Sequence, residues 1–184
     1  MTARGRRLLN VVVLGVGVAL ILFVASRAGS SSNGSSTNGS GPARDVPLFV
    51  RTTCADVVVL GLRGSGQSTT ASKGVGNEVL ASVSAMATQL HRRSDATVRL
   101  EAVPFPANYA PTLARYISHI KQGKKLMATR LTELSARCKD TSFAFVGFSQ
   151  GANVVHNFSA DLTAAQARRV AVVAMIADPV KNPA

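Results

Sequence analysis

The chain has 184 residues, a formal net charge of +12, 46% hydrophobic residues and no tryptophan. This length fits one domain plus an appendage, and the aliphatic composition suits a parallel sheet covered by helices on both faces. The positive charge suggests nucleic acid or an anionic surface as a partner. Because the basic residues are scattered and no nucleic-acid motif accompanies them, the sequence argues against nucleic-acid binding. Attraction to an anionic envelope or lipid surface stays open.

The N-terminal segment has a basic start, residues 1–7, followed by an uncharged and mostly apolar run, residues 8–26. Two interpretations of residues 1–28 stay open. A signal peptide would be cleaved after Ala28, whereas an uncleaved anchor would cross the bilayer as a helix. In both cases the basic end stays cytoplasmic and the rest of the chain is exported. We expect a secreted or extracytoplasmic protein, held at the membrane if the segment is an anchor.

Residues 29–45 are rich in Ser, Gly and Asn and are expected to form a flexible linker, because they cannot bury enough apolar surface to order themselves. The folded domain is expected to span residues 46–184, as a monomer. Within it, apolar runs typical of buried strands alternate with segments of helical periodicity. Strands are predicted at 55–60, 97–103, 142–146 and 170–177, and helices at 74–92, 110–138 and 152–158.

This alternation predicts an α/β fold with a parallel sheet and helices on both faces. The apolar side chains of the second predicted helix are expected to share one face against the sheet. They are Leu113, Ile117, Ile120, Met127, Leu131 and Leu134. Gly123 is expected to break or bend that helix.

The most informative motif is Gly147-Phe148-Ser149-Gln150-Gly151, which follows a predicted strand and precedes a predicted helix. A Gly-x-Ser-x-Gly sequence between a strand and a helix forms a very tight turn. The backbone of its serine is strained, and both flanking positions need glycine. The serine hydroxyl then lies above the sheet at a helix N-terminus, where backbone N–H groups favour negative charge. The motif therefore predicts that Ser149 is a nucleophile.

Two cysteines, Cys54 and Cys138, are present. An even number behind an export segment favours a disulfide, with two buried free thiols as the alternative. The three histidines show no ligand spacing, so we expect no metal site and no cofactor.

Together these features resemble the cutinase-like serine esterases of the α/β-hydrolase superfamily, especially the actinobacterial group. The resemblance covers about residues 54–178 and rests on four matches. They are the positions of Cys54 and Cys138, the loop Arg63-Gly64-Ser65, the elbow 147–152 with Phe148 for the usual tyrosine, and the strand end Ile176-Ala177-Asp178-Pro179. It implies a three-layer α/β/α hydrolase-type fold with a parallel central sheet, and a disulfide between the two cysteines.

The resemblance also implies hydrolysis of carboxylic esters. Ser149 would attack the acyl carbon and form an acyl-enzyme. The oxyanion would be held by the backbone N–H of Gln150 and by Ser65, through its N–H and hydroxyl. The substrate could be a lipid, a polyester, a small ester or a thioester.

A serine nucleophile also needs a base, usually a histidine oriented by a carboxylate. In the family both partners lie beyond the strand that here ends near Asp178, so we expect a C-terminally truncated fold that is missing its last elements. Asp178 and His156 are weak candidates for the acid and the base, and His91 and His119 are weaker ones. His156 lies two helical turns beyond Ser149, about 10 Å along a helix axis, which is too far for direct proton transfer.

Three explanations for the missing catalytic acid and base stay open. The sequence is a fragment of a longer enzyme, or a truncated gene product without activity, or a separate chain completes the site.

The main expectation is a serine esterase. One alternative is a catalytically inactive, envelope-associated binding protein that uses the hydrolase fold as a basic, lipid-facing module. Another is a periplasmic acyltransferase, in which an alcohol other than water resolves the acyl-enzyme.

Overall fold

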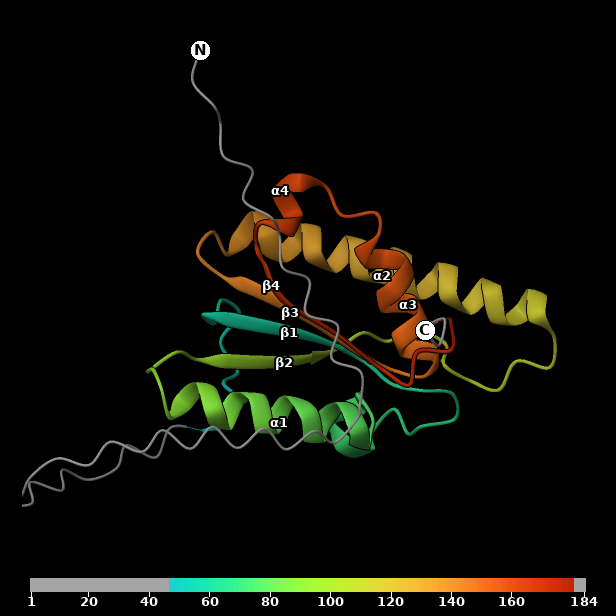
Figure 1. Cartoon of the computed structure of the whole chain (residues 1–184), viewed down its shortest axis with the longest axis horizontal. Coiled ribbons are helices and arrows are strands. Elements are labelled where there is room, and N and C mark those ends of the chain that lie inside the picture. The colour runs from blue at the N-terminus through green and yellow to red at the C-terminus, as the bar shows by residue number, and fades with distance from the viewer. Residues whose placement is uncertain (1–46, 181–184) are drawn as a thin grey trace, which may run out of the picture.

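The computed structural model describes residues 47–180. Its centre is a parallel sheet with the strand order β2-β1-β3-β4. The strands are β1 (Val57–Leu62), β2 (Val98–Ala102), β3 (Ser142–Phe148) and β4 (Val170–Ile176). The helices are η1 (Ala71–Gly74, 3-10), α1 (Asn77–His91), α2 (Leu113–Arg137), α3 (Gln150–Ser159) and α4 (Ala164–Ala167). Helix α1 covers one face of the sheet and α2 and α3 cover the other (Figure 1), which confirms the predicted three-layer α/β hydrolase-type fold.

The hydrophobic core has two parts, one on each face of the sheet. Alternate residues of β1 point to opposite faces, so Leu60 packs against the α2 and α3 side while Val59 packs against α1. Both side chains are fully buried. Burial on both faces explains why the central strands read as unbroken apolar runs in the sequence.

Of the predicted break or bend at Gly123, the break is absent, because α2 runs without interruption from Leu113 to Arg137. The residue is buried, and a Cβ atom there would lie 2.8 Å from Cγ2 of Val154 in α3. The glycine is therefore explained by packing. It allows α2 to approach α3 more closely than any side chain would permit.

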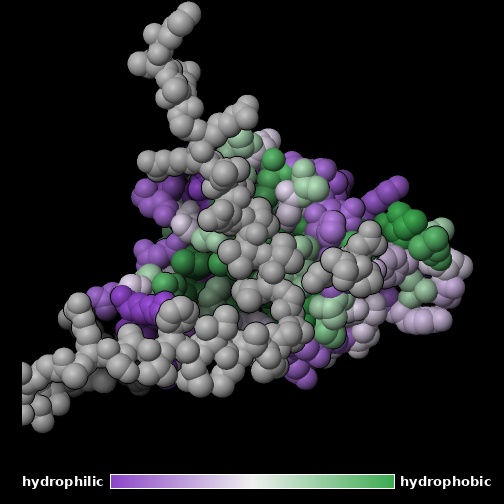
Figure 2. All heavy atoms as spheres, viewed as in Figure 1, coloured by the Kyte–Doolittle hydropathy of each residue, from purple (hydrophilic) through white to green (hydrophobic). Residues whose placement is uncertain are grey.

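The first turns of α2 also differ from the prediction. Leu113 and Ile117 were expected to face the sheet, but they are 73% and 43% exposed, and Tyr109 in the preceding loop is 82% exposed. Figure 2 shows strongly hydrophobic atoms on the surface where α2 begins. Helix α2 begins beyond the ends of the strands (Figure 1), which explains why Leu113 and Ile117 near its start are exposed.

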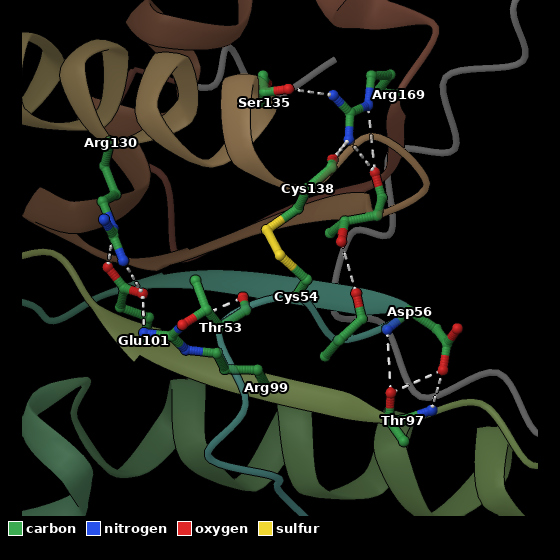
Figure 3. The surroundings of a disulfide bond; sticks show 12 residues. Thr53, Cys54, Asp56, Thr97, Arg99, Glu101, Arg130, Ser135, Cys138 and Arg169 are labelled. Atoms are coloured by element: carbon green, nitrogen blue, oxygen red, sulfur yellow. Dashed lines mark hydrogen bonds and ion pairs between the residues drawn. A yellow bond between two sulfur atoms is a disulfide. The ribbon is translucent and has the colours of Figure 1, made fainter.

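The predicted disulfide between Cys54 and Cys138 is present and joins the segment before β1 to the end of α2 (Figure 3). Its sequence separation is 84 residues. Closing a loop of this length lowers the entropy of the unfolded chain, which raises the free energy of that state by about 4–5 kcal/mol at 25 °C. Arg169, just before β4, donates to the carbonyl oxygens of Ser135, Thr141 and Cys138. These contacts hold the N-terminal edge of the sheet against α2.

Between residues 47 and 180, the structure contains no helix that is long and apolar enough to cross a membrane. The predicted signal peptide or anchor at 1–28 and the predicted linker at 29–45 lie outside the described residues.

Candidate active site

Ser149 lies at the sharp turn between β3 and α3, where the sequence motif predicted it. Its backbone has φ 50° and ψ −114°, a left-handed conformation that L-residues rarely adopt. Its N–H donates to the carbonyl oxygen of Ile176, 2.9 Å away, at the end of β4. The residue is only partly buried. The turn therefore holds a strained serine at the carboxyl edge of the sheet, where active sites of α/β folds are built.

The two glycines of the motif are required by close contacts. A Cβ atom at Gly147 would lie 2.4 Å from the carbonyl oxygen of Gly151. A Cβ atom at Gly151 would lie 2.3 Å from the carbonyl oxygen of Leu62 and 2.7 Å from that of Arg63. Gly151 thus brings the first turn of α3 directly against the end of β1 and the loop that follows it.

That contact places Ser65 beside Gln150. The Ser65 hydroxyl lies 2.8 Å from Oε1 of Gln150, and Ser65 is exposed while Gln150 is 1% exposed. Gln150 is the first residue of α3, so its backbone N–H has no acceptor within the helix. This N–H group lies at the N-terminus of the helix, which is the positive end of the helix dipole. The structure therefore gathers Ser149, Gln150 and Ser65 at one place.

The loop that carries Ser65 is fixed by contacts that the sequence motifs did not predict. The Gly64 N–H donates to Oε1 of Gln67 at 2.6 Å, and the Gln67 amide nitrogen donates to Glu78 in α1. Arg63 is buried and its guanidinium lies over the Phe105 ring, 5.6 Å from the ring centre. Burial lowers the pKa of the Arg63 guanidinium from its ordinary value. No local pattern predicts the Gln67–Glu78 contact, because it joins a loop to a helix that begins later.

His156 and Asp178 are paired with each other. Nδ1 of His156 lies 2.7 Å from Oδ2 of Asp178, and the side chains are 45% and 3% exposed. Oδ1 of Asp178 also accepts from the Val180 N–H at 3.1 Å. The pair joins α3 to the turn after β4. Within residues 47–180, no hydrogen bond joins the Ser149 hydroxyl to a histidine.

His119 is 6% exposed, and its Nδ1 lies 3.5 Å from Nε2 of Gln150. The sequence predicts that His119 lies on a helix covering the sheet, which is confirmed, but it does not predict the contact between His119 and Gln150. His91 is the last residue of α1, the helix that covers the opposite face of the sheet from α2 and α3. The described part of the chain holds no group of three or more His, Cys, Asp or Glu side chains that could bind a metal ion.

Comparisons with known proteins agree with this architecture. The family model described as cutinase matches residues 53–183. A cutinase of Coprinopsis cinerea is 31% identical over 131 residues, covering 71% of this chain and 61% of the relative. A cutinase of Monilinia fructicola is 27% identical, covering 68% and 58%. The solved structure of a Trichoderma reesei cutinase in complex with a phosphonate inhibitor superposes with a TM-score of 0.50 at 27% identity, covering 66% and 52%.

The catalytic core domain of an acetyl xylan esterase from Trichoderma reesei has a TM-score of 0.51 at 23% identity, covering 68% of this chain and 65% of that one, and shows the fold alone. The chain spans about three fifths of the length of the curated relatives named above, 61% and 58%. These matches lend no support to the alternative of an inactive binding protein. Since the family model matches well over half of the sequence, this chain belongs to the cutinase family.

Proposed function

We propose that this protein hydrolyses carboxylic esters through an acyl-enzyme formed on Ser149. The observation that carries the proposal is the strained turn at Ser149, with φ 50°, placed beside Gln150 and Ser65. A serine held in this way at the end of a strand and the start of a helix is the nucleophile arrangement of α/β-hydrolases. The family membership supports the same reaction class.

In the proposed reaction, the Ser149 oxygen attacks the ester carbon and the carbonyl oxygen gains negative charge. The backbone N–H of Gln150 and the Ser65 N–H and hydroxyl donate hydrogen bonds to this oxyanion. The carbon–oxygen bond to the alcohol then breaks, the alcohol leaves with a proton, and water later releases the acyl group as the acid. Removing one such oxyanion donor typically lowers kcat by about 10²–10³-fold.

We do not assign the His156–Asp178 pair as the base in this reaction. The pair has the hydrogen bond of a catalytic acid and base, but His156 is two turns along α3 from Ser149, about 10 Å along the helix axis. We propose instead that the pair fastens the turn after β4 to α3. Its buried carboxylate is satisfied by His156 and by the Val180 N–H.

The surface near Ser65 suits an ester with an apolar acyl part. The Gly66 N–H donates to the Ala107 carbonyl oxygen at 2.8 Å, which joins the Ser65 loop to the loop that leads into α2. Exposed apolar side chains follow at Tyr109, Leu113 and Ile117. We propose that this apolar surface receives lipid or polyester chains.

We further propose that the protein acts outside the cytoplasm, with residues 1–28 as a signal peptide or membrane anchor. The disulfide between Cys54 and Cys138 supports this location, because disulfides persist in oxidising compartments.

Turnover of p-nitrophenyl butyrate by the purified, disulfide-bonded protein tests the proposed reaction. Wild type is expected to hydrolyse the ester, and Ser149→Ala is expected to be inactive with an unchanged melting temperature. Ser159→Ala is a matched control, since that serine lies at the far end of the same helix. Equal rates for wild type and Ser149→Ala would refute the proposal.

A further inference from the structure

Three side chains from different elements form a contiguous polar contact beside the nucleophile. Ser65 lies 2.8 Å from Oε1 of Gln150, and Nε2 of Gln150 lies 3.5 Å from Nδ1 of His119. Gln150 and His119 are 1% and 6% exposed. Because buried polar groups must be satisfied inside the protein, the protons of these three groups are not independent of one another.

The close approach of α2 and α3 creates this contact. His119 and Gly123 are four residues apart in α2, and Gln150 and Val154 are four residues apart in α3, so each pair lies on one helix face. A Cβ atom at Gly123 would lie 2.8 Å from Val154. The missing side chain therefore brings the α2 face that carries His119 within reach of Gln150.

Two proton arrangements fit these heavy-atom positions. In the first, the Ser65 hydroxyl donates to Oε1 of Gln150, and Nε2 of Gln150 donates to Nδ1 of His119. In the second, the amide is turned by half a rotation, so that Nδ1–H of His119 donates to the amide oxygen. The amide nitrogen then donates to the Ser65 oxygen. The positions of the heavy atoms do not distinguish the oxygen of a side-chain amide from its nitrogen. The hydrogen-bond network therefore decides between these two arrangements.

The two arrangements differ in what the Ser65 hydroxyl can do. In the first, its only proton is used on Gln150 and is not free for an oxyanion. In the second, the oxygen accepts from Gln150 and the proton is free to point toward the substrate. Only the second arrangement makes the hydroxyl a pre-organised oxyanion donor.

We infer that His119 is a positioning residue: its Nδ1–H holds the Gln150 amide in the orientation that frees the Ser65 hydroxyl to donate to the oxyanion. This inference rests on the proposed esterase function, since it assigns a cause to one of the oxyanion donors of that site. His119 itself does not touch the reacting atoms.

The tautomer of His119 tests the inference without any need for activity. In ¹⁵N-labelled protein, a long-range ¹H–¹⁵N spectrum of the histidine rings distinguishes a protonated Nδ1 from a protonated Nε2, and His119→Leu identifies the His119 signals. The spectrum would be recorded at about pH 8.5, above the usual imidazole pKa of about 6.5. We expect the proton on Nδ1. A neutral ring with its proton on Nε2 would overturn the inference.

A variant series supplies the functional readout. His119→Leu is expected to lower kcat for p-nitrophenyl butyrate about tenfold with KM unchanged, less than the loss of a whole oxyanion donor. His119→Asn places an amide nitrogen near the position of Nδ1 and is expected to retain most of kcat. If His119 acts through Ser65, the double variant His119→Leu/Ser65→Ala will be no slower than Ser65→Ala. Multiplied losses in the double variant would contradict the inference. A wild type without turnover would refute the proposed function, while the tautomer would still decide the proton arrangement.

Discussion

Gly151→Ala is the substitution that most directly strains the contact between the elbow and the end of β1. The added Cβ would lie 2.3 Å from the Leu62 carbonyl oxygen and 2.7 Å from that of Arg63. A carbon and a carbonyl oxygen normally stay at least about 3.3 Å apart, so α3 and the end of β1 would have to separate by about 1 Å. Both obstacles are backbone atoms and cannot rotate away.

Overpacking of this kind costs up to about 3 kcal/mol, and alanine recovers about 1 kcal/mol in helix propensity over glycine. We therefore expect Gly151→Ala to lower the free energy of unfolding by about 2 kcal/mol. The separation would also move Gln150 away from Ser65. The rate of ester turnover per folded molecule of the variant should therefore be lower than that of wild type.

Equilibrium unfolding in urea, with the disulfide intact, measures the change in stability. Gly66→Ala is the matched control, because Gly66 has φ +74° but no atom within 4 Å of an added Cβ. The free energy of unfolding of the control should fall by only about 1–2 kcal/mol, the cost of placing alanine in a left-handed conformation. Its Ser65–Gln150 contact should stay in place. If Gly151→Ala keeps both wild-type stability and wild-type turnover, the reasoning about this contact is wrong.

Three further predictions concern regions outside the elbow. Replacing Cys54 and Cys138 together by alanine should lower the free energy of unfolding by up to about 4–5 kcal/mol, read from urea unfolding against the oxidised wild type; a change below 1 kcal/mol would contradict it. Asp56 accepts hydrogen bonds from the Thr97 N–H and hydroxyl, which lower the pKa of its carboxyl group. Its stabilisation is thus complete above the unfolded pKa of about 3.9 and is lost as the pH falls through the lower folded pKa. Asp56→Asn should flatten the acid side of stability against pH, and an unchanged profile would refute this. His156→Ala should lower stability by about 1 kcal/mol yet leave kcat within about threefold of wild type, whereas a loss of 10²-fold or more would make this histidine a catalytic base.

Local patterns predicted the strands, the sheet and the elbow because each depends on residues close together in the chain. Apolar runs identify strands that are buried on both faces, and Gly147 and Gly151 identify a turn without room for side chains. What the sequence did not predict comes from packing between distant segments. Within the helical pattern, Gly123 predicts a break or a bend, whereas in the structure its missing side chain lets Val154 of α3 approach.

The same limit applies to the candidate site. The contact between His119 and Gln150 joins residues 31 positions apart, and the pair of His156 with Asp178 joins residues 22 positions apart. Helical periodicity shows which side chains share a face, but not which other element lies opposite. The first contact depends on how α2 packs against α3, and the second on where the turn after β4 lies relative to α3.

The nucleophilic character of Ser149 is tested most directly by covalent labelling with a fluorophosphonate, followed by peptide mass spectrometry. The phosphorus of such a probe is attacked by an activated serine, fluoride leaves, and the modified peptide identifies the residue. We predict that the label is found on Ser149 in the native protein and disappears on unfolding in urea or in Ser149→Ala. A native protein labelled on another serine, or labelled equally before and after unfolding, would contradict the assignment.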